Sequence, residues 1–321
     1  MMNDDYLWDR SGEPDEEIAR LEKVLGPLRL PQTDRTPITK RVHSNVARRW
    51  MWAAAAAALV MGAFLAVWRK QTAGAETSWR LLYPGAKASA IRTGQVIETS
   101  PAQSAALESE WIGRVDIAGN SRLRLLSSQR NGQQRLALDH GTIHALIWAP
   151  PAQFVVDTPA AKAVDLGCQY TLQVAEDGSG LLTVETGWVA FQWHHRESFI
   201  PAGAACRTRP GHGPDTPYFL DAPEKLTKAV GRFDMADDAG ALRNALNAAR
   251  PRDAFTVWHL LTRTQGSQRG EVFDRFSELV KLPQTIDRAA VINGDQHAID
   301  TAWDALELGD TSWWRAWKRD W

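Results

Sequence analysis

Through the middle of the chain, hydrophobic residues alternate with polar ones at every second position. The alternation begins at Trp111–Ile117 and recurs in short segments as far as Val189 and Phe191, separated by turns that contain glycine or asparagine. A period of two places successive side chains on opposite faces of a strand. The pattern predicts a mainly β, mostly antiparallel domain over residues 79–208, folded as a sandwich or roll.

After residue 222 the hydrophobic period becomes that of a helix. Apolar residues lie three and four positions apart in 236–250, 253–264 and 271–280, and Pro251, Gly266 and Pro283 fall between the segments as breaks. We expect residues 222–321 to form an α-helical module with antiparallel neighbours. A helical bundle and a two-helix repeat both remain open, because the sequence shows no fixed repeat period.

An uncharged segment, Trp50–Trp68, stands between Arg48-Arg49 and Arg69-Lys70. As a helix it would rise about 28 Å, close to the hydrocarbon thickness of a bilayer. Tryptophans at both ends favour a transmembrane helix over a buried soluble helix. A cleaved signal peptide is the second alternative, since Ala73-Gly74-Ala75 has the spacing of a cleavage site. The long segment before the span argues against it.

More basic residues precede this span than follow it, which places the N-terminus in the cytoplasm. We therefore expect a single-pass protein of a bacterial inner membrane, with residues 69–321 in the periplasm. Cys168 and Cys206 both fall in this exported part, where thiols tend to be oxidised. We expect a disulfide between them, the alternative being two separate buried thiols.

The N-terminal segment, residues 1–29, has the pattern of a short amphipathic helix that starts at Pro14 and ends at Gly26-Pro27. So short a helix cannot bury its apolar face alone, and a second apolar patch precedes it. We expect an element that docks to a cytoplasmic protein, or else a weakly ordered tail. Residues 30–49 resemble a tether. The expected partner-binding residues are Tyr6, Leu7, Trp8, Ile18, Leu21, Val24 and Leu25.

Composition and motifs exclude several functions. A net charge of -1 and a pI near 6.7 argue against direct nucleic-acid binding. His194 and His195 are neighbours on a strand and point to opposite faces, and His140 and His144 have no acidic or cysteine companion at ligand spacing. Gly178-Ser179-Gly180 is typical of a hairpin turn, not of a nucleophile elbow. We expect no enzyme activity, no metal and no cofactor.

Across roughly residues 91–191, a series of turn and strand residues resembles the FecR domain family. The residues that carry the resemblance are Gly113, Ser121, Gly141, Thr158, Pro159, Asp165, Leu166, Gly167 and Gly187. The resemblance implies a membrane-bound regulator of an extracytoplasmic-function sigma factor. In that family the exterior domain senses a signal and the cytoplasmic segment contacts the sigma factor.

Some features depart from the family. Cys168 stands where the family commonly has threonine, and the helical C-terminus argues against the outer-membrane transporter partner of iron-uptake members. The cytoplasmic segment also lacks zinc ligands, its only histidine being His43. The exterior protein or ligand is therefore open. The alternative function is an envelope scaffold or ligand-binding protein that holds cell-wall glycan or another envelope protein.

The C-terminal tail contains four tryptophans, interspersed with Arg315, Lys318 and Arg319. Three explanations are open: the indoles pack on the helical module, rest at a membrane interface, or hold a glycan or peptide. The tryptophans are Trp313, Trp314, Trp317 and Trp321.

Overall fold

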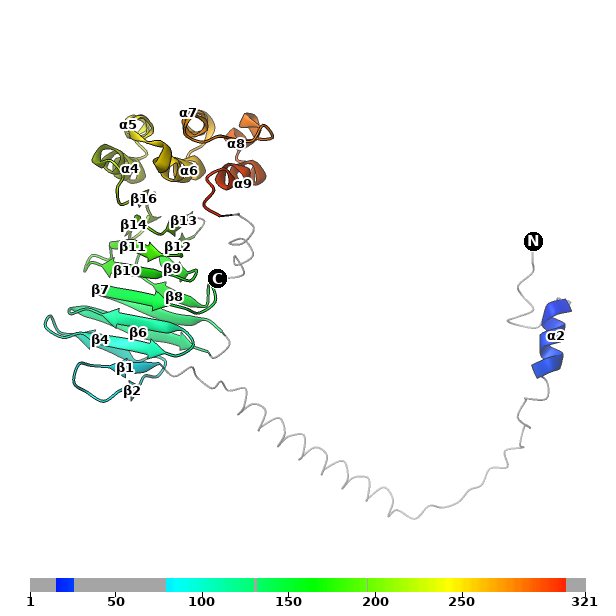
Figure 1. The fold of residues 1–321 in the computed structure, drawn as a ribbon, viewed down its shortest axis with the longest axis horizontal. Coiled ribbons are helices and arrows are strands. Elements are labelled where there is room, and N and C mark those ends of the chain that lie inside the picture. The colour runs from blue at the N-terminus through cyan, green and yellow to red at the C-terminus, as the bar shows by residue number, and fades with distance from the viewer. Residues whose placement is uncertain (1–15, 26–78, 130–131, 195, 310–321) are drawn as a thin grey trace, which may run out of the picture. The chain divides into compact units, whose positions relative to one another are not determined.

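The computed structural model describes residues 16–25, 79–129, 132–194 and 196–309 (Figure 1). The chain divides into two units, Met1–Val67 and Trp68–Trp321. Within the described residues, no helix is both long and apolar enough to cross a membrane. The predicted span 50–68, the tether 30–49 and the patch at Tyr6, Leu7 and Trp8 lie outside the described residues.

The described part of the first unit is helix α2 (Glu16–Leu25). The predicted amphipathic helix is therefore present. Val24 and Leu25 are exposed, at 69% and 54%. An apolar pair this open to solvent on a helix of three turns is consistent with a surface that a partner covers.

The second unit begins with two β-sheets that share the long strand β7 (Gln134–Ile147). Neighbouring strands in both sheets are antiparallel, except for the parallel pair β7 and β8. The first sheet runs β2 (Ser89–Ala90), β1 (Arg80–Leu82), β4 (Ala105–Ser109), β5 (Gly113–Ile117), β7, β10 (Gln169–Val174), β11 (Gly180–Thr186) and β14 (Ala204–Arg209), with β15 (Gly213–Pro214) and β16 (Tyr218–Phe219) both paired to β14. The second runs β3 (Val96–Thr99), β6 (Ser121–Ser128), β7, β8 (Phe154–Asp157), β9 (Lys162–Asp165), β12 (Trp188–Trp193) and β13 (Arg196–Pro201).

β7 changes sheets at Gly141. Residues before it pair with β6 and β8, and residues from Gly141 onward pair with β5 and β10. Gly141 has φ +103°, and a Cβ there would collide with Ser121 on β6. Only glycine allows this backbone conformation and this close approach, so one residue lets a single strand serve two sheets.

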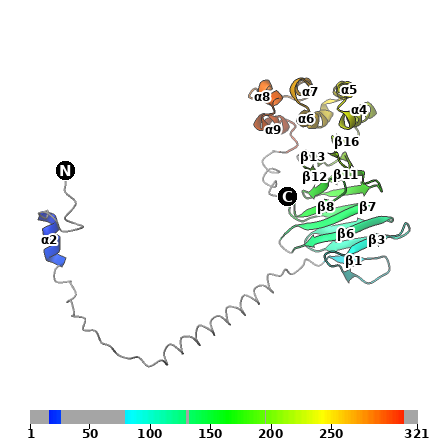
Figure 2. The same cartoon turned by 180° about the vertical axis from the view of Figure 1, so that it is seen from behind.

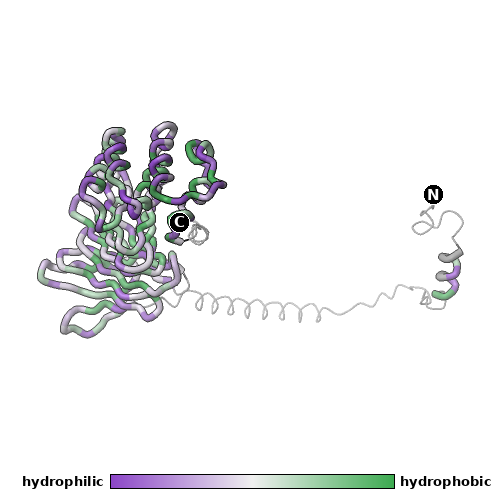
Figure 3. Tube along the Cα trace, turned by 45° about the horizontal axis from the view of Figure 1, so that its top comes forward, coloured by the Kyte–Doolittle hydropathy of each residue, from purple (hydrophilic) through white to green (hydrophobic). Residues whose placement is uncertain are grey.

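Period-two alternation generates the core, as expected. On β6, for example, Leu123 and Leu125 are buried while Arg124 between them is partly exposed. Figure 3 shows hydrophobic and hydrophilic positions alternating along the strands. The inward residues of both sheets belong to one continuous hydrophobic cluster. The strands continue to Phe219, beyond the expected boundary at residue 208, because β15 and β16 add to β14.

A helical module follows, as the sequence predicted. Its helices are α4 (Glu224–Ala236), α5 (Ala239–Ala248), α6 (Ala254–Arg263), α7 (Gly266–Leu279), α8 (Arg288–Asn293) and α9 (Gln296–Asp304), with the 3₁₀ turn η2 (Pro251–Asp253) between α5 and α6. The segments expected at 236–250, 253–264 and 271–280 correspond to α5, α6 and α7, whereas α4, α8 and α9 were not predicted. The helices lie over the end of the sheets formed by β13, β14 and β16 (Figures 1 and 2).

The predicted disulfide between Cys168 and Cys206 is wrong, because both are free, buried thiols. Cys206 on β14 pairs with Leu182 on β11, and Leu182 pairs with Leu172 on β10, the strand that begins just after Cys168. β11 therefore lies between the two cysteines. β10 and β14 are therefore two strand spacings apart, about 9.5 Å. A disulfide can bridge Cα atoms only up to about 7 Å apart.

Candidate functional site at the junction of the sheets and helices

The helical module is joined to the sheets by an aromatic cluster around Trp303 of α9, which is fully buried. The centroid of its ring lies 4.7 Å from that of Trp258 on α6 and 5.9 Å from that of Phe199 on β13. The Trp258 indole N–H donates to the carbonyl oxygen of Ile299 on α9 (3.0 Å). Aromatic contacts of this kind bury large apolar areas, so the cluster holds α6 and α9 against β13.

Beside the aromatic cluster, Arg263 extends from the end of α6 into the sheets. Its Nη2 donates to Ser198 Oγ on β13 (2.6 Å) and to the Asp215 carbonyl oxygen (2.8 Å), and its Nη1 donates to Thr216 Oγ1. Only 6% of the side chain is exposed. Burial lowers the pKa of Arg263, and the carboxylate of Asp234 opposes that shift. The guanidinium keeps its charge because its intrinsic pKa is very high.

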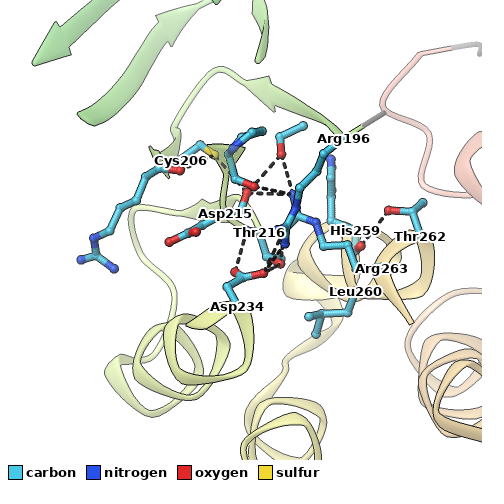
Figure 4. A network of polar contacts seen from close by, with 12 residues as sticks. Arg196, Cys206, Asp215, Thr216, Asp234, His259, Leu260, Thr262 and Arg263 are labelled. Carbon is cyan, nitrogen blue, oxygen red and sulfur yellow. Dashed lines mark hydrogen bonds and ion pairs between the residues drawn. The ribbon is translucent and has the colours of Figure 1, made fainter. Parts of the chain in front are cut away.

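Asp234, near the end of α4, is the acceptor at the centre of this network (Figure 4). Its Oδ2 accepts the Thr216 N–H (2.7 Å), and its Oδ1 accepts from Thr216 Oγ1 (3.0 Å) and Arg196 Nη2 (2.9 Å). The carboxylate also forms an ion pair with Arg263 (3.4 Å). Removing one partner of such a buried pair typically costs about 3–5 kcal/mol. The network thus ties α4 and α6 to β13 and to the segment before β16.

His259 of α6 accepts a hydrogen bond from the backbone of β13. The Phe199 N–H donates to His259 Nε2 (3.2 Å), so the Nδ1 atom carries the proton and donates to the Phe255 carbonyl oxygen (3.0 Å). Burial, together with the nearby Arg263 charge, lowers the pKa of His259 to about 3. The ring is therefore neutral at physiological pH, which its hydrogen bond to Phe199 requires.

A groove of about 960 Å³ opens beside this network. The β12–β13 hairpin contributes Trp193, Arg196 and Phe199 to one wall, and the helices form the other. The residues that the helices contribute include Met235, Asp237, Trp258, Arg269, Gln296 and Asp300. Met235 is 67% exposed there. A concave site of this size, with aromatic walls and a few charged groups between the sheets and the helical module, has the features of a ligand-binding site.

The histidines that the sequence singled out do not gather in this groove. His140 and His144 lie on either side of Gly141 on β7, and His144 Nδ1 contacts Thr171 Oγ1 on β10 (3.0 Å). His194 lines the groove, while His195 lies outside the described residues. Among the residues that the structure describes, no three His, Cys, Asp or Glu side chains are placed to hold a metal ion.

Comparison with known proteins identifies the β-sheet region. Residues 95–190 match the model of the FecR protein family. This part of the chain is a FecR domain. It runs from the start of β3 into β12, so the FecR domain includes the shared strand β7 and ends beside the junction groove.

Two crystal structures of a candidate anti-sigma factor from Parabacteroides distasonis also resemble this chain. Each has 16% sequence identity and a TM-score of 0.35, and the match covers 41% of this chain and 63% or 62% of theirs. The chain thus spans somewhat less than two thirds of the length of those structures. Among curated proteins, none matches the chain.

Within the FecR domain, the motif residues form turns and close contacts distributed along the sheets, and none of them lines the groove. Thr158 Oγ1 accepts the Ala161 N–H (3.0 Å) and donates to the Ala161 carbonyl oxygen (2.8 Å), closing the turn between β8 and β9 around Pro159. Gly187 approaches Gly167 so closely that a Cβ would collide with the Gly167 carbonyl oxygen. These residues position strands, as do Gly113, Ser121, Gly141 and Leu166.

Asp165 of the FecR domain organises the turn before β10. Its Oδ1 accepts the Gly167 N–H (2.7 Å), and its Oδ2 accepts from the Cys168 thiol. The carboxyl is 1% exposed, and burial raises its pKa to about 7. The thiol at position 168 thus donates to the motif aspartate, as a threonine hydroxyl could also do.

On helix α2, the expected partner-binding residues divide by what the structure describes. Val24 and Leu25 are exposed, and Ile18 and Leu21 belong to the same helix. This arrangement leaves an apolar helix end open to a partner.

The sequence did not predict the junction residues Arg196, Asp234, His259 and Arg263. Arg263 is 29 residues from Asp234 and 65 from Ser198. The sequence holds one weak signal: a histidine and an arginine stand four residues apart in Ala254–Arg263, whose other residues are apolar except for two threonines. Polar groups on a buried helix face need partners, but the sequence does not name them.

Proposed function

We propose that the protein is a membrane-anchored, FecR-like regulator of an extracytoplasmic-function sigma factor. The observation that carries the proposal is the FecR domain at residues 95–190, a domain that is typical of such regulators. The amphipathic helix α2, with Val24 and Leu25 exposed, supports it as a surface for the sigma factor.

The proposed arrangement has α2 and the patch Tyr6, Leu7 and Trp8 in the cytoplasm as the sigma-binding segment, residues 1–29. Residues 30–49 form the tether and residues 50–68 cross the inner membrane once. The sheets and the helical module then lie in the periplasm. The charge-free composition of 50–68 and the excess of basic residues before it support this topology.

The proposed mechanism starts at the junction groove, where an exterior ligand or protein would contact both the β12–β13 hairpin, which follows the FecR domain, and the helices. Asp234 of α4 forms an ion pair with Arg196 of β13 across that boundary, and a second one with Arg263 of α6. An occupant that changes how α4 and α6 sit on β13 would therefore alter the whole periplasmic unit. The change reaches α2 through dimer geometry or proteolysis, and α2 then alters its hold on the sigma factor.

An envelope scaffold is the second candidate, and exposed aromatics in the loops at one end of the first sheet favour it. Trp111 and Trp148 are 67% and 55% exposed, and the Trp148 indole N–H donates to the Glu110 carbonyl oxygen (2.9 Å), which places the two tryptophans near each other. Exposed indoles of this kind are suited to stacking on a glycan or another envelope protein.

Deletion of residues 3–29 distinguishes the two functions. For a regulator, the deletion abolishes the protein's effect on a sigma-dependent promoter, measured with a transcriptional reporter in the native host. For a scaffold, reporter activity stays unchanged while the Trp111→Ser and Trp148→Ser substitutions remove envelope binding. A reporter that does not respond to the deletion, with the protein present at normal amounts, would overturn the regulatory proposal.

A further inference from the structure

The junction groove lies close to the point where the described chain ends. The Trp303 indole N–H of α9 donates to the Gly309 carbonyl oxygen (2.8 Å), which fixes the last described residue against α9. Trp303 in turn packs on Trp258, whose side chain lines the groove. α9 itself contributes Ile299 and Asp300 to the groove. The last described residue, Gly309, is therefore linked to the groove-lining Trp258 through one side chain, that of Trp303.

The groove offers two kinds of surface. Trp193, Met235 and Ile299 supply apolar area. Asp237 adds a carboxylate to the same lining, and the Glu197 carboxylate there accepts a hydrogen bond from Gln192 (2.9 Å). The guanidinium of Arg196 is already bound to Asp234 (2.9 Å), and Arg269 donates to the carbonyl oxygens of Thr264 and Ile292 (2.7 and 3.3 Å). A segment that combines aromatic rings with cations is complementary to these walls.

Residues 310–321 have that composition. The segment contains Trp313, Trp314, Trp317 and Trp321, together with Arg315, Lys318 and Arg319. Four indoles in so short a segment favour burial, since each can remove about 150–250 Å² from water. Extended, the segment can reach about 40 Å, which is ample for a groove whose lining residue Trp258 is separated from Gly309 by the Trp303 side chain.

We propose that residues 310–321 bind in the junction groove of their own chain, with indoles against Trp193 and Met235 and cations near Asp237. The tail then acts as an internal occupant that any exterior ligand of the groove must displace. This inference does not depend on the sigma factor: it concerns only the described groove and the segment that follows it.

The test is photo-crosslinking in the full chain, expressed in cells. A benzophenone amino acid replaces Met235, whose exposed side chain tolerates a larger group. The matched control places the same group at Val96, which is also exposed and lies on β3 at the opposite edge of the second sheet. Crosslinked peptides are identified by mass spectrometry, and the size of each product is read from a denaturing gel.

The expected product is a single chain in which position 235 is joined to residues 310–321, with no such product from position 96. Replacing the four tail tryptophans with serine should lower the yield about ten-fold, because aromatic anchors dominate such contacts. Crosslinks from position 235 to lipid, to another protein or to a second copy at twice the mass would overturn the proposal. A yield that does not change in the serine variant would do the same.

Discussion

At the residue scale, several buried polar groups at the junction form hydrogen bonds between the helices and the sheets. His259 of α6 accepts the Phe199 N–H of β13, and Arg263 donates to Ser198 and Asp215. Unsatisfied, each group would cost about 1–3 kcal/mol. Docking of the helices therefore provides the Phe199 N–H of β13 with a partner, and α6 is placed by specific partners as well as by apolar burial.

The pKa of His259 gives a testable pH dependence. Burial lowers it to about 3 in the folded protein, whereas an unfolded histidine titrates near 6.5. Keeping His259 neutral in the folded protein therefore costs no stability above pH 6.5. Below pH 6.5 the unfolded chain binds the proton more readily, so the folded protein loses stability as the pH falls toward 3. Between pH 7 and pH 4 the loss is about 3 kcal/mol. His259→Gln should remove this contribution, so the free energy of unfolding, from urea titrations across this range, should fall less steeply with acid.

Exposed His212 provides the matched control, because His212→Gln changes the same residue type on the surface. That variant should keep the wild-type pH dependence. If His259→Gln and wild type lose the same free energy between pH 7 and pH 4, then His259 does not remain neutral in the folded protein.

At the element scale, periodicity predicted the strands of the FecR domain because alternation survives in the sequence wherever one face is buried. It predicted α6 and α7 for the same reason. Helix α4 was missed even though Leu226, Val230 and Phe233 follow a helical period, and α8 and α9 are too short to give a clear one. The disulfide prediction failed because β11 lies between the two cysteines, and this order of strands cannot be read from the spacing of the cysteines in the chain.

The bend of β7 at Gly141 leads to a second prediction. Gly141→Ala places a Cβ against Ser121 at φ +103°, so either β6 or β7 must shift. We expect a loss of about 3 kcal/mol or more in the free energy of unfolding, from the clash and the backbone strain together. Chemical denaturation monitored by circular dichroism measures it.

Gly203→Ala is the control for backbone strain alone. Gly203 also has a positive φ (+78°), but a Cβ there would meet nothing within 4 Å. Its loss should be about 1–2 kcal/mol. Equal losses in the two variants would mean that the approach of Ser121 contributes nothing and that β7 does not depend on glycine to change sheets.

At the scale of the whole molecule, the described chain contains three parts: a helix with an exposed apolar end, a FecR domain, and a helical module with a groove at its base. The sequence indicated these parts and the family of the middle one. It could not indicate the groove, since Trp193, Met235 and Asp300 meet only after the helices fold onto the β12–β13 hairpin. Nor could it specify which side chains couple the module to the sheets.

The most direct test of the central claim is affinity capture from the native host with residues 1–49 as bait, in wild-type form and with Val24→Asp or Leu21→Asp. Lys23→Gln is the matched control, because it changes the charge by the same amount on the opposite helix face. We predict that wild type and Lys23→Gln recover an extracytoplasmic-function sigma factor, identified by mass spectrometry. The two aspartate variants should recover at least about ten-fold less, since each places a charge in the apolar contact. Recovery of no sigma factor by the intact wild-type bait, or equal recovery by all four, would contradict the account.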